Sequence, residues 1–192
     1  IITNPPPTLL ISTLIARIFR KKNIIDMRDF WIDAAVSLGF IKNKFVVSCL
    51  KKFEGYCLKK ASIIITNSLY IQKTLKQQYI DKKIKYVPFN VNLEQFRKIK
   101  CDIENDIVYI GNIGAAQNLE KIVQAISIVI KEYPKIRIKI YGGGDQEESI
   151  KKQIKKLELS QNILIQEPVS RKEIPKILSK SRIGIVPLAD NK

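Results

Sequence analysis

The sequence predicts an α/β protein with parallel sheets, organised as two Rossmann-like domains. Short apolar runs rich in β-branched residues alternate with amphipathic segments, as strands and helices do around a parallel sheet. This alternation stops at residues 89–104 and then resumes, which indicates a linker. Two glycine turns, at residues 111–114 and 142–144, each follow a strand-like run. We expect the two domains to join near residue 98 and both to be incomplete.

The first half begins with apolar residues at helical spacing over residues 9–19, followed by the basic cluster Arg20-Lys21-Lys22. Residues 61–66 form an apolar, β-branched run, and Asn67 and Ser68 after it can cap a helix. Pro88 ends the last strand of this half. We therefore expect helices at 9–19, 45–58 and 71–79, and strands at 23–29, 61–66 and 83–87.

The second half repeats the same alternation, with Pro134 and Pro168 at turns between elements. Its apolar runs are strand-sized, and the segments between them have helical periodicity. We expect strands at 106–111, 136–141, 162–166 and 182–187, and helices at 118–131, 146–157 and 171–179.

Composition excludes several classes of function. The 192 residues contain no histidine, and the three cysteines are irregularly spaced, so we expect neither a metal site nor a disulfide framework. Catalytic Ser-His and Cys-His pairs are also excluded. No apolar stretch approaches the roughly 20 residues that cross a bilayer. We expect a cytoplasmic location, and, because the chain starts at Ile1 without Met, an internal piece of a longer protein.

The net charge of +16 is concentrated in the first half. Residues 1–98 hold 18 of the 34 basic residues but only 6 of the 18 acidic ones. Basic residues interleaved with apolar ones favour an anionic partner surface, either a membrane or a nucleic acid. The alternative is a lysine-rich composition with no particular partner.

The two glycine turns carry the clearest chemical signal. Gly111, Asn112, Gly114 and Gln117 lie where a strand passes into a helix, so backbone N–H groups and the helix N-terminus can face a phosphate. Gly143 lies in the second turn, which is expected at the same sheet edge. The alternative is that these glycines serve turn geometry alone.

The chain resembles the GT-B glycosyltransferases of family 4, the retaining group that uses nucleotide sugars. It is most similar to the fucosamine-transferase-like branch of surface-polysaccharide synthesis. The segments that carry this resemblance are Ile25-Asp26-Met27-Arg28-Asp29-Phe30-Trp31, Phe53-Glu54-Gly55-Tyr56, residues 61–68, Val87-Pro88-Phe89-Asn90-Val91-Asn92 with Phe96, residues 109–120, and residues 181–188.

The resemblance implies that residues 1–98 belong to the acceptor-side domain and residues 99–192 to the donor-binding domain. The donor diphosphate would lie on the residues of the two glycine turns and on Arg171, and Glu167 and Val169 would meet the nucleobase. Asp29 would be catalytic, with Arg28 and Trp31 on the acceptor side. Asp26 and Asp33 are weaker candidates, and Glu54 is expected to be structural, capping or pairing on its helix. A structural Arg–Asp pair at the strand end is the alternative for the first-half residues.

The resemblance also implies partners: a nucleotide sugar, a glycan acceptor that is frequently lipid-linked, and the inner face of the cell membrane. No metal, no cofactor other than the nucleotide-sugar substrate, and no nucleic acid are expected. Two other functions are considered, a sugar-nucleotide epimerase of the same fold and a non-enzymatic basic protein that binds membrane or nucleic acid.

The sequence departs from the family pattern at several positions. Asn112 and Gln117 stand where much of the family has Arg and Lys, so diphosphate binding would depend on backbone N–H groups. Asn90 and Asn92 replace a Gly and an Asp, and Asn tolerates positive φ. The family's paired glutamates are expected beyond Lys192, and its first glycine loop before Ile1.

Overall fold

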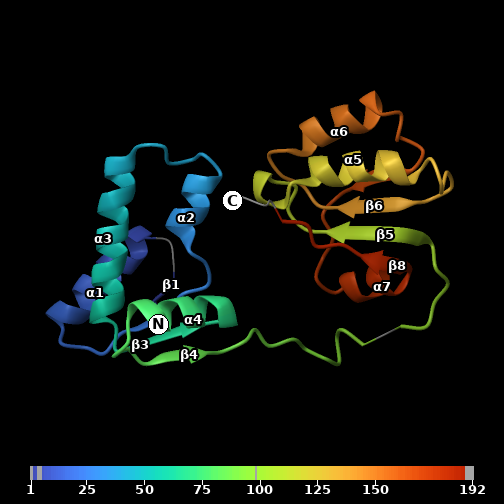
Figure 1. Ribbon diagram of the computed structural model, residues 1–192. Coiled ribbons are helices and arrows are strands. Elements are labelled where there is room, and N and C mark those ends of the chain that lie inside the picture. The colour runs from blue at the N-terminus through green and yellow to red at the C-terminus, as the bar shows by residue number, and fades with distance from the viewer. Residues whose placement is uncertain (1, 4–5, 98, 189–192) are drawn as a thin grey trace. The chain divides into compact units, whose positions relative to one another are not determined.

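The computed structural model describes residues 2–3, 6–97 and 99–188, and it has two compact units (Figure 1). One unit extends to Asn90 and the other begins at Val91, within the aperiodic stretch 89–104. Residue 98, near which the junction was expected, lies outside the described residues. Each unit has its own parallel sheet and its own apolar core, so the predicted α/β fold class is confirmed.

The first unit is built on four parallel strands in the order β1-β2-β3-β4. In the central pair, Ile25 lies opposite Ile64, and both side chains are buried. Parallel strands that follow each other in the chain and are adjacent in the sheet must be joined by crossover connections. Helices form these connections here. The strands are β1 (Ile2–Thr3), β2 (Ile24–Asp26), β3 (Ile63–Thr66) and β4 (Ile84–Tyr86).

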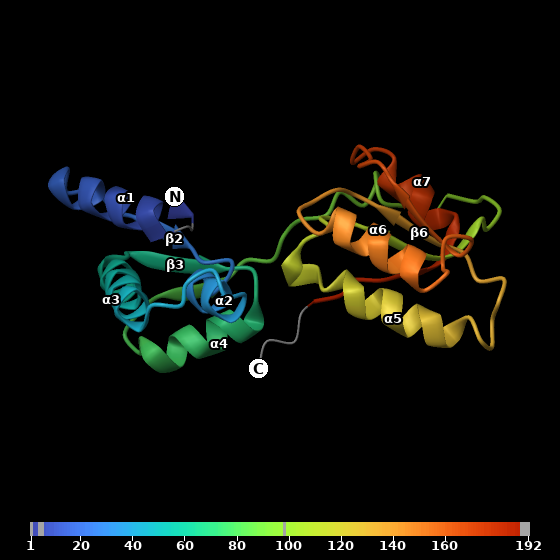
Figure 2. The ribbon, with the colours of Figure 1, turned by 90° about the horizontal axis from the view of Figure 1, so that it is seen from above.

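Four helices cover this sheet, and two of them, α1 and α3, lie side by side (Figures 1 and 2). Leu9 from α1, Leu58 from α3 and Leu75 from α4 pack into one core with Ile25 and Ile64. Burial of these apolar side chains is the main force that holds the unit together. The helices are α1 (Pro6–Ile18), α2 (Trp31–Ser37), α3 (Lys44–Lys60) and α4 (Leu69–Gln78).

Side chains cap the starts of two helices in this unit, α3 and α4. The Asn43 side chain accepts hydrogen bonds from the N–H groups of Phe45 and Val46, at 2.9 and 3.3 Å. Ser68 caps α4 by accepting from Ile71, as its position in the sequence predicted. Helix α2 was not predicted, because it has only seven residues and no side chain caps its start at Phe30.

The second unit has four parallel strands in the order β7-β6-β5-β8. Its core gathers side chains from β5, β6, α5 and α6, and these two helices lie side by side in both views (Figures 1 and 2). The elements are β5 (Asn105–Ile110), the 3₁₀ turn η1 (Ala115–Gln117), α5 (Leu119–Val129), β6 (Ile138–Tyr141), α6 (Glu147–Lys156), β7 (Ile163–Gln166), α7 (Ile174–Ser179) and β8 (Ser181–Gly184).

One predicted helix start in this unit was confirmed and another was wrong. The helix expected from residue 118 begins at Leu119, and its N-cap Asn118 has a left-handed conformation with φ +48°, after a separate 3₁₀ turn. The helix expected from residue 171 begins at Ile174, so Arg171 lies in the preceding turn. The later start is set by a turn at residues 171–173, and helical periodicity does not predict turn geometry.

Asn92 stabilises a turn in the segment that leads into the second unit. Its side chain accepts hydrogen bonds from the N–H groups of Glu94 and Gln95, at 3.0 and 3.1 Å. The amide oxygen therefore does what a carboxylate oxygen would do at this position. Asn90 is not among the described residues with positive φ, so the turn does not use the conformational tolerance expected there.

Candidate functional site

Three loops of the second unit meet at one edge of its sheet. Strands β5, β6 and β7 are parallel neighbours, so the loops that follow them emerge at their common carboxyl edge. Ligands of open α/β sheets bind at such edges. The topology thus brings together all donor-side candidates: Gly111, Asn112, Gly114, Gln117, Gly143, Glu167, Val169 and Arg171.

The two glycine turns approach each other so closely that side chains would not fit. A Cβ on Gly142, where φ is +154°, would overlap the carbonyl oxygen of Gly111. A Cβ on Gly144, where φ is +159°, would overlap the carbonyl oxygen of Ile113. Glycine is therefore required at both positions for backbone packing. Gly143 is different, because a Cβ there would meet no atom closer than 3.5 Å.

Hydrogen bonds fix the first turn against the second. The N–H of Ile113 donates to the carbonyl of Gly143 at 3.0 Å, and the N–H of Gln146 donates to the carbonyl of Ile113 at 3.0 Å. The buried Tyr109 hydroxyl donates to the carbonyl of Asn112 at 2.6 Å, and burial raises the pKa of this phenol. Sequence reasoning did not identify Tyr109 as a positioning residue, although it lies two residues before Gly111 in a strand.

Backbone donors remain available at the first turn. In the part of this unit that the structure describes, the N–H groups of Gly114, Ala115 and Ala116 form no hydrogen bond, whereas Gln117 N–H donates to Gly114. Unpaired N–H groups at the start of a helical turn are the donors that proteins use to bind anions. The turn therefore has the backbone chemistry of an anion site.

The side chains of the first turn add no positive charge. Asn112 is exposed, and Gln117 is half-buried with its Oε1 atom lacking a hydrogen-bond partner. A negative charge lies close by, since Oδ1 of Asp145 lies 3.2 Å from the place that a Cβ on Gly114 would take. An anion here would be held by backbone dipoles close to a carboxylate.

The loop after β7 presents the remaining candidates. Glu167 is exposed, Val169 is half-buried, and Pro168 lies 3.8 Å from the place of a Gly143 Cβ. The Arg171 guanidinium lies 5.9 Å from the ring centroid of Phe96, a cation–π arrangement. Arg171 is otherwise exposed, so this contact is what links its side chain to Phe96.

In the first unit, Arg28 is held at the carboxyl end of β2. Its guanidinium pairs with Asp26 at 2.9 Å and lies 5.1 Å from the ring centroid of Phe89. A structural Arg–Asp pair at the strand end, expected as the alternative, is therefore present, with Asp26 as the partner of Arg28. Asp29 and Trp31 are both exposed, beside Arg28 and at the start of α2.

Glu54 is unusual among the acidic residues. Burial is the main cause that raises its pKa to about 7, and the negative charge of Asp33 adds to the effect. Its Oε1 atom is buried without a hydrogen-bond partner, and Lys51 pairs with Asp33 instead, at 2.5 Å. The expectation that Glu54 caps or pairs on its helix is not met at this oxygen.

A parallel α/β sheet with two interlocked glycine turns at its carboxyl edge is the arrangement of nucleotide-binding proteins. The sequence matches the model of the family Glycosyl transferases group 1 over residues 92–190, slightly more than half of the chain. The chain therefore belongs to the group 1 glycosyltransferase family.

One curated relative is the poly(glycerol-phosphate) alpha-glucosyltransferase of Bacillus subtilis (strain 168), which is 31% identical over 86 residues. This match covers 45% of the chain but only 11% of the relative, so the chain spans a small part of that protein's length.

Solved structures share the fold at low sequence identity. Sucrose-phosphate synthase from Thermosynechococcus elongatus matches with a TM-score of 0.72 and 13% identity, over 93% of this chain and 48% of that one. A mutant of S. aureus TarM, in complex with Fondaparinux, alpha-GlcNAc-glycerol and UDP, matches with a TM-score of 0.60 and 18% identity, over 69% and 27%. The pneumococcal O-GlcNAc transferase GtfA, in complex with UDP and GlcNAc, matches at 0.57 and 13%, over 90% and 39%.

Among the described residues, no helix combines the length and the hydropathy needed to cross a membrane. Among the same residues, no three His, Cys, Asp or Glu side chains gather where they could hold a metal ion.

Proposed function

We propose that the protein is a glycosyltransferase whose second unit binds a nucleotide-diphosphate sugar. The single observation that carries this proposal is the interlocked pair of glycine turns with unpaired N–H groups at Gly114, Ala115 and Ala116. Such N–H groups would hold the diphosphate and stabilise the negative charge that develops on it as the sugar leaves. Membership of the group 1 family supports this assignment.

Within this proposal, each loop of the second unit has a role. Gly111, Asn112, Gly114, Gln117 and Gly143 would surround the diphosphate. The backbone of Glu167 and Val169 would meet the nucleobase, because a backbone N–H and C=O pair can contact a base edge. Arg171 would support this loop through Phe96, and its guanidinium could also reach a phosphate oxygen.

The first unit would receive the acceptor. Asp29 would orient the acceptor hydroxyl or stabilise the positive charge of the transition state, with Arg28 and Trp31 beside it. We further propose a retaining reaction of the family 4 type, in the fucosamine-transferase-like branch, on a glycan or lipid-linked acceptor in surface-polysaccharide synthesis. The sequence resemblance supports these finer assignments.

We also propose that the protein is cytoplasmic and contacts the inner face of the cell membrane, and the excess of basic residues in the first half supports this. Each cation near an anionic bilayer contributes about 1 kcal/mol of attraction. The α1 helix carries exposed apolar side chains beside the cations at its C-terminal end, which suits an interface of water and lipid. These side chains are Ile11, Leu14, Ile15 and Ile18, and the exposed Phe19 directly follows the helix.

Amide chemical-shift mapping of the chain with UDP tests the donor site. UDP is the probe because the solved TarM and GtfA complexes contain it. We expect shifts at residues 111–117, 142–145 and 167–171. Shifts confined to the basic residues of the first unit would contradict the proposal, since they would indicate attraction of a polyanion to net charge.

A further inference from the structure

A small basic pocket lies in the first unit, at the opposite edge of the sheet from Arg28 and Asp29. Its cavity volume is about 280 Å³. Asn23 and Ser62 immediately precede β2 and β3, so the pocket opens at the amino ends of these strands. The remaining lining residues come from α1, the turn after it and the end of α3: Thr13, Ala16, Arg17, Arg20, Lys21 and Lys60.

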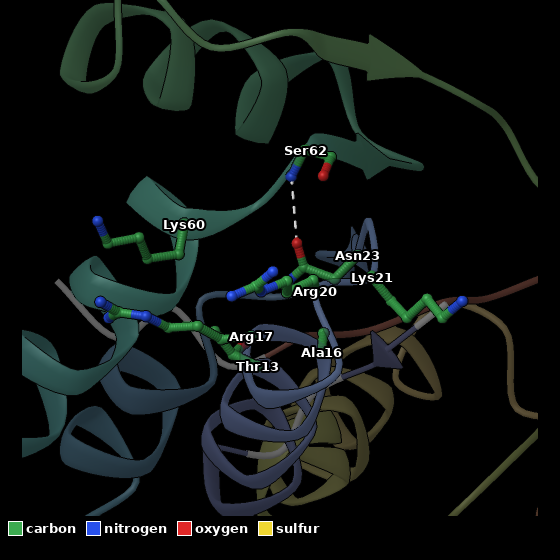
Figure 3. A pocket seen from close by; sticks show the side chains of 8 residues that line it. All are labelled: Thr13, Ala16, Arg17, Arg20, Lys21, Asn23, Lys60 and Ser62. Atoms are coloured by element: carbon green, nitrogen blue, oxygen red, sulfur yellow. Dashed lines mark hydrogen bonds between the residues drawn. The ribbon is translucent and has the colours of Figure 1, made fainter.

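The charge of this pocket is entirely positive. In Figure 3, the side chains of Arg17, Arg20 and Lys60 extend to the same side of the view, whereas Lys21 extends to the opposite side. No acidic side chain lines the pocket. Within the part of the chain that the structure describes, none of these four cations forms an ion pair with a carboxylate, although Arg17 donates to the Tyr56 hydroxyl.

Two buried polar side chains line the same pocket. Thr13 is 2% exposed, and its hydroxyl has no hydrogen bond of ordinary geometry, although it interacts with the Cys57 thiol. Asn23 is 7% exposed, and its Oδ1 accepts a hydrogen bond from the N–H group of Ser62 at 3.2 Å. This bond uses only the oxygen of the side-chain amide and leaves its N–H₂ group as a donor. A thiol is only a weak hydrogen-bond partner, so the Thr13 hydroxyl can still donate to a stronger acceptor.

Helix dipoles explain part of this charge but not all of it. Arg17 and Lys60 lie in the last turns of α1 and α3, where cations offset the partial negative charge of the helix end. Each helix end carries roughly half an elementary charge, so two ends offset about one of the four cations. A net positive charge remains around the two buried polar groups.

We propose that this pocket binds a phosphate group as a site separate from the donor site. Arginine and lysine side chains, a hydroxyl and an amide N–H₂ group all donate hydrogen bonds, which suits an anion whose oxygens only accept. The volume lies just below the range of about 300–1,000 Å³ that is typical of ligand pockets, which suits a small anion. The phosphate belongs either to an anionic lipid headgroup or to a free phosphate compound.

Isothermal titration of the chain with inorganic phosphate at constant ionic strength tests this site. The double variant Arg20→Gln with Lys60→Gln removes two lining cations and should weaken phosphate binding at least about tenfold. The control variant Lys52→Gln with Lys59→Gln removes the same charge from exposed positions of α3 outside the pocket. It should change the affinity less than about twofold. Equal losses in both variants would overturn the proposal, because net charge alone would then explain binding.

Two further measurements keep the proposal testable if a variant is unstable. In the unmodified chain, phosphate should shift the side-chain amide signals of Asn23, and an absence of shifts there would overturn the assignment. Thr13→Val changes no charge and should weaken binding about threefold, provided that thermal melting shows a folded protein. Unchanged affinity in that variant would remove the hydroxyl from the site.

Vesicles of phosphatidylcholine with phosphatidic acid distinguish the two sources of the phosphate. If inorganic phosphate displaces the chain from these vesicles, the ligand is a lipid headgroup. If phosphate binds at the pocket without displacing the vesicles, the ligand is a soluble phosphate compound. Both results support the pocket, and neither depends on the donor site, which lies in the other unit and is tested with UDP.

Discussion

The hydroxyl of Tyr109 donates a hydrogen bond of 2.6 Å to the carbonyl oxygen of Asn112. This bond closes the first glycine turn on the strand that precedes it. The proposed diphosphate donors at residues 114–116 follow directly, so the bond holds their backbone in place before a ligand arrives. A preorganised site loses less entropy on binding than a mobile one.

Tyr109→Phe removes this bond while keeping the buried ring. A lost hydrogen bond costs about 1 kcal/mol, so we expect about that loss in the free energy of unfolding and about fivefold weaker binding of UDP. Urea unfolding and calorimetry measure the two effects. Tyr133→Phe is the control, because the Tyr133 side chain is 58% exposed. Equal results for the two variants would show that the Tyr109 bond does not organise the turn.

The close approach of the glycine turns predicts a contrast between neighbouring positions. Gly142→Ala places a methyl group against the Gly111 carbonyl at positive φ, and we expect it to lower the free energy of unfolding by about 3 kcal/mol or more. Gly143→Ala meets no atom closer than 3.5 Å and should cost less than about 1 kcal/mol. Thermal melting of both variants checks this contrast, and similar melting temperatures would contradict the observed packing.

Asp145 places a carboxylate beside a turn that lacks cationic side chains. Asp145→Asn removes repulsion of the diphosphate, and we expect UDP to bind about threefold to fivefold more tightly, a gain of about 1 kcal/mol at most. Asp102→Asn is a matched control, since Asp102 is exposed and lies outside the turns. Titration calorimetry at low salt checks both variants. Weaker UDP binding in Asp145→Asn would mean that the carboxylate contacts the ligand favourably.

The raised pKa of Glu54 predicts that stability of the first unit depends on pH. The pKa is about 7 in the folded chain and 4.5 without the fold, so between these values the folded state holds more protons. Stability should therefore fall as pH rises from about 4.5 to about 7, by about 1–2 kcal/mol after allowing for partial exposure. Asp33 opposes ionisation of Glu54, whereas Lys51 favours it.

Glu54→Gln cannot ionise and should lack this part of the pH dependence. Urea unfolding of both proteins at pH 5 and pH 8 measures the difference, and Glu94→Gln serves as an exposed control. An identical pH dependence in wild type and Glu54→Gln would show that the carboxyl group keeps an ordinary pKa.

The sequence predicted those features that depend on periodicity. Apolar runs such as residues 61–66 and 136–141 identified strands, and the order of elements identified the parallel class, because both depend on which faces are buried. Ser68 was predicted as a cap because its chemistry is local. The helix Trp31–Ser37 was not predicted, because it is shorter than the window in which periodicity can be recognised.

The candidate site was predictable in its location but not in its contacts. Glycines after strands identified the two turns, yet only the structure shows that Gly142 and Gly144 pack against the first turn while Gly143 does not. Pairing of Arg28 with Asp26, and packing of Arg171 on Phe96, depend on where side chains point in space. Sequence spacing carries no information about such contacts.

The most direct test of the central claim compares nucleotides with a plain polyanion. Calorimetry at constant ionic strength measures the affinities of the chain for UDP, ADP, GDP and inorganic pyrophosphate. If the three loops of the second unit form a donor site, at least one nucleotide should bind about tenfold more tightly than pyrophosphate, because the loop after β7 adds contacts to the nucleoside. Equal affinities for all four would contradict the claim and leave only the attraction of a basic protein for anions.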